Sequence, residues 1–390
     1  HGLLSPFEWW CRNFILPDIC KPCLFVFLRN LFYLTIIAKG RMTLKRTDFT
    51  QFWWKNSGID KAQLSIVLLA HVQQPRGHIN QAQLQCSETE RFSIEEFNEI
   101  YQGIVNAGYY IQAVYYNELD FITEYIEHPE HFSNCLIYNL ARNGLGDNKK
   151  TIIPAFCELV GLNYTSSSSL SCALCRNKYY FTTLFQTHGI PVPQSWLFTD
   201  AGILGDRMPR DGTQVICKPC SESASQGVSA AGVFLASQDM FQRFKGTHYI
   251  IQEYIGGEEC EVPVFKVGNS INVLEPVGID LGGKSILDEQ ASAYNQYGFY
   301  HLGDTQKLHT IDTIRAYAEK AFRLMQMDVY GRIDFRIAAD GTPYIFDVST
   351  TPYTTKHSSF AFAFERLGLS YSEIYQAIIF AALQRENAKC

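Results

Sequence analysis

The sequence predicts an α/β (α+β) protein of three successive domains. Between about 60 and 170, continuous apolar runs such as 64–70 alternate with segments of helical spacing, which is the pattern of a buried sheet connected by helices. Pro191 and Pro193 then end a helix, a second group of short strands follows, and a third group begins near Cys260. Because 390 residues exceed the usual size of one hydrophobic core, we expect each group to have its own core.

The first predicted domain, 42–175, alternates strands and helices. Phe97, Ile100 and Ile104 are three and four residues apart, so they share one face of a helix. We expect a strand, a helix, two strands and a helix at 64–70, 93–106, 110–116, 135–139 and 152–160.

The second and third predicted domains, 176–256 and 257–390, contain more strands than the first. In the second domain, a helix that starts near Leu184 precedes strands at 214–218, 232–235 and 249–253. In the third, we expect strands at 271–277, 331–337 and 344–348, and helices at 310–327 and 370–383.

Residues 1–41 differ in character from the rest of the chain. They contain the apolar run 23–38, which Arg29 and Asn30 interrupt and which is shorter than the roughly 20 apolar residues of a spanning helix. Met42 begins a sequence that looks like a natural start. We therefore interpret 1–41 as a non-native or disordered extension and expect no membrane partner; a membrane-associating N-terminal helix is the alternative.

Composition limits the classes of partner. Hydrophobic residues make up 46% of the chain, charged residues 18%, and the net charge is −6, so we expect neither disorder nor nucleic-acid binding. Three cysteine pairs have CxxC spacing: Cys20/Cys23, Cys172/Cys175 and Cys217/Cys220. They lack further ligands at zinc-site spacing. We therefore expect buried free thiols and a cytoplasmic protein.

A predicted hairpin in the third domain carries the clearest candidate site. Arg332 and Asp334 are two residues apart on its first strand, as are Asp347 and Ser349 on its second, so all four share one face. Carboxylate oxygens bind hard cations, and an arginine neutralises a phosphoryl group in transfer. The hairpin therefore fits a magnesium–triphosphate site; a surface hairpin with alternating charge is the alternative.

Two upstream segments fit the same interpretation. Lys218 ends a strand and precedes a loop of small residues, 221–227, whose backbone amides can cover phosphates. Gln252 and Glu253 leave a strand toward two glycines and Glu259. This linker can offer backbone groups to an adenine edge and a carboxylate to ribose hydroxyls.

Together these motifs resemble the ATP-grasp superfamily, and within it D-alanine–D-alanine ligase, over about 64–385. The matching features, in order, are Lys178, the Lys218 strand and its loop, the linker QEYIGGEE, and the hairpin GRIDF…DVSTTP. The resemblance implies a three-domain ATP-grasp fold with ATP between the central and C-terminal domains. It also implies a carboxylate–amine ligase that forms an acylphosphate and releases ADP and phosphate. ATP, two Mg²⁺ ions (or Mn²⁺), small-molecule carboxylate and amine substrates such as amino acids, and a homodimer are consistent with it.

The resemblance also implies roles for individual residues. ATP-binding positions are Lys178, Lys218, Ser225, Gly227, Gln252, Glu253, Ile255 and Glu259. Metal-binding positions are Asp334, Asp347 and Ser349. Catalytic positions are Arg332, Lys218 and Ser358. Among these, Arg332 stabilises the transferred phosphate and the oxyanion, and Ser358 holds the carboxylate of the second substrate.

The match fails around the substrate. Ser349 stands where the family has Asn, and Tyr353 stands where it has Gly. The family's glycine-rich segment with its acidic residue is not recognisable at 71–77, and its loop serine falls at Ala224. These departures predict a substrate other than a pair of D-alanines.

Further candidates lie in two loops near the expected substrate. The loop 287–300 keeps Tyr294 but lacks the expected lysine, for which Ser292 and Lys284 are the nearest replacements. Asn143 and Asp147 are candidates for amino-acid binding, with an ordinary turn as the alternative, and His357 is a candidate substrate contact.

Two other functions remain open at this point. An ATP-binding protein without ligase turnover, a sensor or partner subunit, is favoured by Ser349, Tyr353 and the missing loop lysine. It is disfavoured by the presence of both Asp334 and Asp347. A small-molecule phosphotransferase on the same fold is the third reading, and ADP formed without free phosphate would indicate it.

Overall fold

The structure is a computed structural model that describes residues 59–73, 90–143, 148–200, 202–204, 208–223, 225–229, 232–237 and 248–385. The predicted extension 1–41, together with Ala224 and Asp147, lies outside these residues. In the part that is described, no helix is long and apolar enough to cross a membrane.

The first sheet is parallel and deeply buried. Its strand order is β2-β1-β3-β4, with β1 at Ser65–Ala70, β2 at Tyr110–Tyr115, β3 at Cys135–Leu140 and β4 at Asn163–Tyr164. Every residue of β3 is buried, as expected for a sheet covered on both faces. Its crossover helices are α4 (Ile94–Asn106), α5 (Glu118–Glu127) and α6 (Ile152–Val160).

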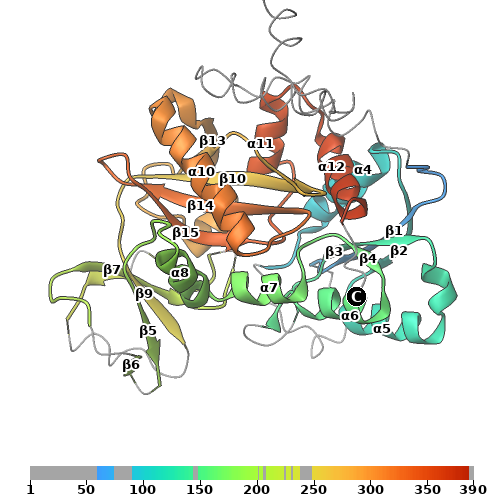
Figure 1. Cartoon of the computed structure of the whole chain (residues 1–390), viewed down its shortest axis with the longest axis horizontal. Coiled ribbons are helices and arrows are strands. Elements are labelled where there is room, and N and C mark those ends of the chain that lie inside the picture. Colours follow the sequence, from blue (N-terminus) through green and yellow to red (C-terminus); the bar gives the residue numbers. More distant parts are fainter. Residues whose placement is uncertain are drawn as a thin grey trace, which may run out of the picture. The chain divides into compact units, whose positions relative to one another are not determined.

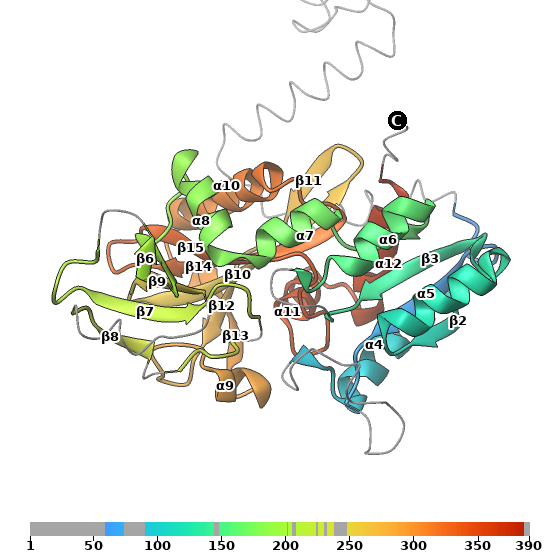
Figure 2. The same cartoon turned by 90° about the horizontal axis from the view of Figure 1, so that it is seen from below.

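The second sheet is antiparallel, in the order β6-β5-β9-β7-β8. Its strands are β5 (Ser195–Thr199), β6 (Gly202–Leu204), β7 (Gln214–Pro219), β8 (Val233–Leu235) and β9 (Tyr249–Glu253). Helices α7 (Ser169–Arg176) and α8 (Lys178–Thr187) precede it. Figure 2 shows this sheet beside the third one, with the first sheet on the other side of the molecule.

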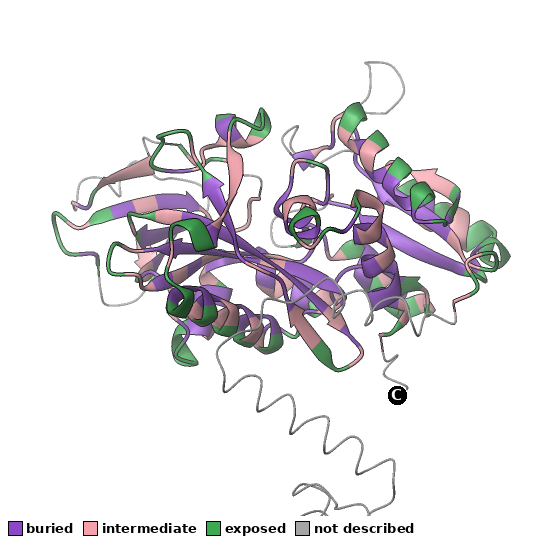
Figure 3. Cartoon of the chain, turned by 90° about the horizontal axis from the view of Figure 1, so that it is seen from above, coloured by how far each residue is buried: buried purple, intermediate pink, exposed green. Residues whose placement is uncertain are grey.

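The third sheet has six strands and provides the largest core. β10 (Glu258–Val267) pairs with β14 (Tyr330–Ile337) and with both β11 (Ser270–Val273) and β12 (Val277–Asp280). β13 (Gly298–His301) and β15 (Pro343–Ser349) form the edges. α10 (Leu308–Leu324) packs its apolar face on this sheet, and β10 and β14 are buried along nearly their whole length (Figure 3).

The three sheets match the three predicted groups of strands, and the predicted α/β (α+β) class is confirmed. The cores are less separate than expected, because Phe181 and Phe185 of α8 belong to the core of the third sheet. One predicted strand, 271–277, is wrong. It is two strands, β11 and β12, with Leu274–Pro276 between them, and Pro276 has no amide to continue a ladder.

Gly257 sets the path from the second sheet into the third. Its φ is +124°, and a Cβ at this position would clash with the carbonyl oxygen of Ile337. Only glycine tolerates both conditions, so the linker after β9 can turn directly into β10.

The C-terminal helix α12 (Tyr371–Leu383) returns to the first sheet. Its Tyr375 ring lies against Gly103 of α4, where a Cβ would clash with the ring. Gln376 also donates a hydrogen bond to the carbonyl of Ala107 at 3.0 Å. Figure 1 shows α12 beside α4, although more than 260 residues separate them in the chain.

Candidate active site

A cavity of about 1220 Å³ is lined by residues of the second and third sheets and by residues of the part of the chain that contains the first sheet. Most of the predicted site residues lie in its wall: Lys178, Lys218, Ser225, Gln252, Glu253, Ile255, Glu259, Arg332, Asp334, Asp347 and Ser349. Gly227 and Ser358 do not.

A row of carboxylates crosses three neighbouring strands of the third sheet. In the register of β14 and β15, Asp334 lies opposite Asp347, and Arg332 lies opposite Ser349. On the other side of β14, Glu261 of β10 lies opposite Asp334. This row therefore presents three acids to the cavity, and the sequence predicted Asp334 and Asp347 but not Glu261.

Arg332 holds this row together. Its Nε and Nη2 each donate to one oxygen of Asp334 at 2.8 Å, and its Nη1 lies 3.0 Å from Oε1 of Glu261. Burial raises the pKa of Asp334 to about 7, although Arg332 acts in the opposite direction. A carboxyl with such a pKa is readily converted between its charged and neutral forms near neutral pH.

Two lysines face the other carboxylate of the hairpin. Nζ of Lys178 lies 3.5 Å from Oδ1 of Asp347 and donates to the carbonyl of Glu222 at 2.7 Å. Burial alone would raise the pKa of Asp347, but Lys178 and Lys218 outweigh it and leave this pKa below its ordinary value. The two aspartates, directly opposite each other, are thus driven in opposite directions.

Lys218 is a buried cation in the cavity wall. Burial, with a further contribution from Lys178, lowers its pKa to about 8. Its Nζ lies 5.3 Å from the centroid of the Phe346 ring and 3.5 Å from the Phe346 carbonyl oxygen. Phe346 is the extra residue of a bulge, because the register of β14 and β15 shifts after Asp334.

The opposite end of the predicted nucleotide site is organised by Arg336. This arginine forms an ion pair with Glu259 and donates to the carbonyls of Ile255 at 2.9 Å and Ser285 at 2.7 Å. The Gln252 side chain donates to the hydroxyl of Ser195 at 3.0 Å. The linker after β9 is therefore fixed on both sides before any ligand binds.

The loop after β7 is joined to helix α9 (Glu289–Ala293). The backbone amide of Gly227 donates to the Glu289 side chain at 3.1 Å, and the amide of Glu289 donates to the carbonyl of Val228 at 3.0 Å. Ser225, with a φ of +54°, lies in the cavity wall. Gly227 thus connects the loop to α9 instead of facing the cavity.

The remaining predicted residues around the substrate have mixed positions. Ser292 and the mostly exposed Tyr294 line the cavity. His357 also lines it, against the ring of Tyr297 at 4.8 Å. Lys284 is outside the wall, 3.4 Å from Asp288.

Ser358 has a structural contact set in this conformation. Its hydroxyl donates to the carbonyl of Thr355 at 2.6 Å and accepts from the amide of Ala361 at 3.2 Å, which caps helix α11 (Ser359–Arg366). Asn143 is also outside the cavity wall, and its backbone amide donates to Glu118.

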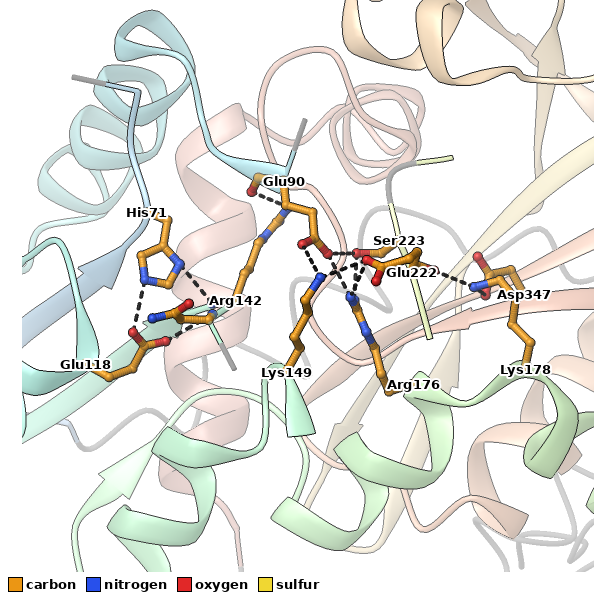
Figure 4. A network of polar contacts seen from close by, with 11 residues as sticks. His71, Glu90, Glu118, Arg142, Lys149, Arg176, Lys178, Glu222, Ser223 and Asp347 are labelled. Atoms are coloured by element: carbon orange, nitrogen blue, oxygen red, sulfur yellow. Dashed lines mark hydrogen bonds and ion pairs between the residues drawn. The ribbon is translucent and has the colours of Figure 1, made fainter. Parts of the chain in front are cut away.

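A buried polar network extends the site toward the first sheet (Figure 4). The carboxylate of Glu90, 0% exposed, lies 2.9 Å from Arg176 and 3.3 Å from Lys149, and it accepts from the hydroxyl of Ser223 at 2.5 Å. The sequence had predicted no recognisable acid and no loop serine here. The structure places an acid, Glu90, in contact with a serine, Ser223, one position before Ala224.

Several site residues were missed at the sequence level for different reasons. Glu261 and Arg336 could have been found, because Glu259 and Glu261, like Asp334 and Arg336, keep the two-residue spacing of one strand face. Glu90 could not, because its partners are 59, 86 and 133 residues away.

Comparison with known proteins gives a consistent family and fold. Residues 184–380 match the family model described as D-ala D-ala ligase C-terminus. The chain is 28% identical over 252 residues to the D-alanine--D-alanine ligase of Acetivibrio thermocellus, covering 60% of this chain and 65% of that protein. It is 27% identical over 268 residues to the uncharacterized protein y4sG of Sinorhizobium fredii, covering 64% of this chain and 75% of that protein.

Solved structures share the fold at lower identity. The D-alanine--D-alanine ligase of Bacillus anthracis complexed with ATP gives a TM-score of 0.59 at 18% identity, covering 82% of this chain and 97% of that one. The D-alanine-D-alanine ligase of Coxiella burnetii gives a TM-score of 0.58 at 16% identity, covering 83% and 94%.

Proposed function

Because the chain belongs to the D-ala D-ala ligase C-terminus family, we propose that it is an ATP-dependent ligase that joins a carboxylate to an amine. One observation carries the proposal. Asp334 and Asp347 lie opposite each other beside Arg332, in the wall of the same cavity as Lys178 and Lys218. Phosphoryl transfer requires oxygen ligands that bind a metal ion and cations that bind the phosphates, and this cavity contains both kinds of group.

The proposed reaction has two steps. An oxygen of the substrate carboxylate bonds to the γ-phosphorus of ATP, the bond from this phosphorus to the β–γ bridging oxygen breaks, and ADP leaves. The amine nitrogen then bonds to the acyl carbon, the bond from this carbon to the phosphate oxygen breaks, and the amine loses a proton. Products are an amide or peptide, ADP and phosphate.

The charges of the cavity suit the first step. Lys178 and Lys218 would hold the phosphates from the side of β7 and α8, while Arg332 would stabilise the group in transfer. The fixed linker near Ile255 would take the adenine, and Glu259 the ribose. Arg336 already pairs with Glu259, so it would keep this carboxylate oriented.

The donor set also fits magnesium. Asp334, Asp347 and Ser349 offer only oxygen atoms, which is the chemistry that Mg²⁺ prefers. A cation there would relieve the repulsion in the row with Glu261, which contributes to the raised pKa of Asp334. When bound, magnesium would neutralise charge on the phosphates; the ordinary alternative ion with the same donors is Mn²⁺.

Water exclusion is the task of the loop after β7 and of helix α9. An acylphosphate exposed to water hydrolyses, so the reaction needs a cover over the site. Glu289 ties these two segments together through the Gly227 amide, and Ser225 and Ser292 face the cavity from them.

We retain the cytoplasm as the compartment, supported by seven buried free cysteines in the described residues, and a homodimer as the assembly to test.

The test is release of ADP and phosphate by protein that starts at Met42. The assay contains magnesium ATP and a panel of D- and L-amino acids, with Asp334→Asn as the inactive control. Both products, formed only by the unsubstituted protein and only with certain amino acids, are expected. ADP without phosphate would indicate a phosphotransferase, and bound ATP without turnover would indicate a nucleotide-binding protein.

A further inference from the structure

We propose that the cavity contains an anion subsite, formed by Arg142, Lys150 and Arg176, that binds a second negatively charged group of the substrate. The substrate class is a small molecule with two carboxylates, of which an acidic amino acid is the simplest. The reaction assigned to this molecule rests on the proposed function, whereas the binding of the anionic group does not.

Lys150 is the residue that requires a ligand. It is 9% exposed, it lines the cavity, and its ammonium makes no hydrogen bond or ion pair with any described residue. A buried cation without a direct counter-ion is unfavourable. An anion entering the cavity would remove this cost.

The surroundings of Lys150 disfavour its charged form. Burial lowers its pKa well below the ordinary value, Arg142 and Arg176 lower it further, and among the described groups Glu90 opposes them. The residue also has a φ of +67°, a backbone conformation that a lysine adopts only where the surroundings enforce it.

Glu90 cannot serve as the missing partner, because other cations already occupy its carboxylate. Arg176 and Lys149 contact its two oxygens, and Ser223 donates to one of them (Figure 4). Burial would raise the pKa of Glu90, but these contacts lower it to about 2. Glu222 is similarly engaged with Lys149 at 2.8 Å.

Four cations lie near the two carboxylates of Glu90 and Glu222. Lys149 and Arg176 form ion pairs with both, Arg142 donates to the backbone carbonyl of Glu90 at 3.2 Å, and Lys150 interacts with Glu90 only at longer range. Glu96 is the next acid, and the N-terminus of α4 engages its carboxylate through the Ser93 amide at 2.8 Å. The described cations outnumber the carboxylates of Glu90 and Glu222 immediately around Lys150, whereas Glu95, Glu96 and Glu99 line the same cavity.

Arg142 provides a rigid wall for the subsite. Its guanidinium lies 4.5 Å from the centroid of the Phe92 ring and 4.4 Å from that of the Tyr353 ring. It is 1% exposed, and its Nε has no hydrogen-bond partner. Thr351, also in the wall and 1% exposed, has an unpartnered hydroxyl. These groups can donate hydrogen bonds to a carboxylate.

The anion subsite is adjacent to the phosphate lysines but separate from them. Glu222 connects the two: its carboxylate contacts Lys149, and its carbonyl accepts from Lys178, which reaches Asp347. A substrate could thus place one carboxylate beside the two aspartates and a second one beside Lys150. The phosphates of ATP have their own lysines and do not need this subsite.

Equilibrium binding of acid and amide pairs tests the subsite. Isothermal titration calorimetry would compare aspartate with asparagine, and glutamate with glutamine, as both enantiomers, with magnesium and a non-hydrolysable ATP analogue present. We expect at least one acid to bind about tenfold or more tightly than its amide, and Lys150→Met to remove this preference. Lys320→Met, on the exposed side of α10, should leave it unchanged.

Equal binding of acids and amides by the unsubstituted protein would overturn the inference, as would a preference that Lys150→Met does not reduce. If Lys150→Met fails to fold, the preference for acids over amides is measured in Lys150→Arg and in the unsubstituted protein, and these two measurements decide whether the subsite exists. ADP release with the same ligands separates the two proposals. If acids bind selectively but no ADP is released, the subsite is supported and the ligase proposal is refuted. If ADP is released equally with acids and with amides, the ligase proposal is supported and the subsite is refuted.

Discussion

The two ends of the cavity differ in how the chain builds them. At the nucleotide end, the functional groups stand on regular strands, and Arg332, Asp334, Asp347 and Ser349 come from one hairpin. At the substrate end, Glu90 comes from the segment before α4, Lys149 from a loop and Arg176 from the end of α7. The hairpin is fixed by a local ladder, whereas the network exists only after three distant segments pack.

This difference has a functional meaning. Strand-borne groups keep their spacing when neighbouring side chains change, so phosphoryl-transfer equipment can be retained with different substrates. Groups on loops can be replaced one by one. The departure at Ser349 lies on the hairpin of the nucleotide end, whereas Tyr353 and the cations around Glu90 belong to the end that we propose selects the substrate. The following predictions separate the two ends.

The largest effect is expected for Asp334→Asn at the nucleotide end. This change removes a charge from the row that would bind magnesium, and it leaves Arg332 beside a neutral amide. We expect ADP release to fall by about 100-fold or more, while the melting temperature changes by only a few degrees. Steady-state ADP release measures the effect.

Asp340→Asn is the matched control, because Asp340 lies exposed in the turn between the same two strands. It should retain activity within about twofold. An Asp334→Asn enzyme as active as this control would contradict the assignment of the hairpin.

The second effect, Arg176→Met, tests the substrate end through stability. The substitution leaves the buried carboxylate of Glu90 with Lys149 and Ser223 only, so the free energy of unfolding should fall by about 3 kcal/mol. Urea unfolding at pH 7 measures it. Arg323→Met, which breaks an exposed pair with Glu319, should change the same quantity by less than about 1 kcal/mol; equal effects would refute a structural role for the network.

The third effect concerns pH at the nucleotide end. Since the pKa of Lys218 is lowered to about 8, this lysine loses its charge as pH rises above that value, and affinity for the phosphates should fall by up to about tenfold between pH 7 and pH 9. Bound phosphate shifts the midpoint upward. Lys218→Arg keeps its charge, so its Kd for ATP, whatever its absolute value, should be nearly independent of pH in this range. The same slope in both proteins would contradict the prediction.

The smallest effect is expected for Glu289→Gln, which weakens the contact between α9 and the Gly227 amide. Loosening one hydrogen bond of a cover should raise the KM for ATP by about two- to fivefold and increase the fraction of ATP hydrolysed without product. Glu319→Gln, on the exposed face of α10, serves as the control. Unchanged coupling between ADP release and product would show that the contact is dispensable.

The extent of sequence-based prediction follows the same division. The hairpin was accessible because its polar residues keep a two-residue spacing, and Asp334 and Asp347 do lie opposite each other. Lys218 was accessible because it ends a short strand before a loop of small residues. The strand predicted at 271–277 was wrong because the apolar pattern was given more weight than Pro276, which lies between the two strands. Ser358 was assigned by position in a motif, although its hydroxyl caps α11.

The rest depended on tertiary packing. Lys149 and Lys150 look like a solvated pair after a turn, and only the fold buries them against Glu90 and Arg142. Charge patterns predict exposed faces well, whereas a buried cation is visible only once its burial is known. The substrate end was therefore the part of the site that the sequence described least.

The return of α12 to the first sheet has a consequence for biosynthesis. A ribosome completes α4 long before it makes Tyr371–Leu383, so the surface around Gly103 remains uncovered until α12 has been synthesised. The hydroxyls of Tyr371 and Tyr375 both donate to the carbonyl of Thr354, beside the cavity-lining residues Tyr353 and Thr355. Chains truncated before α12 should therefore be substrates for chaperones and proteases, and catalytic competence should require α12.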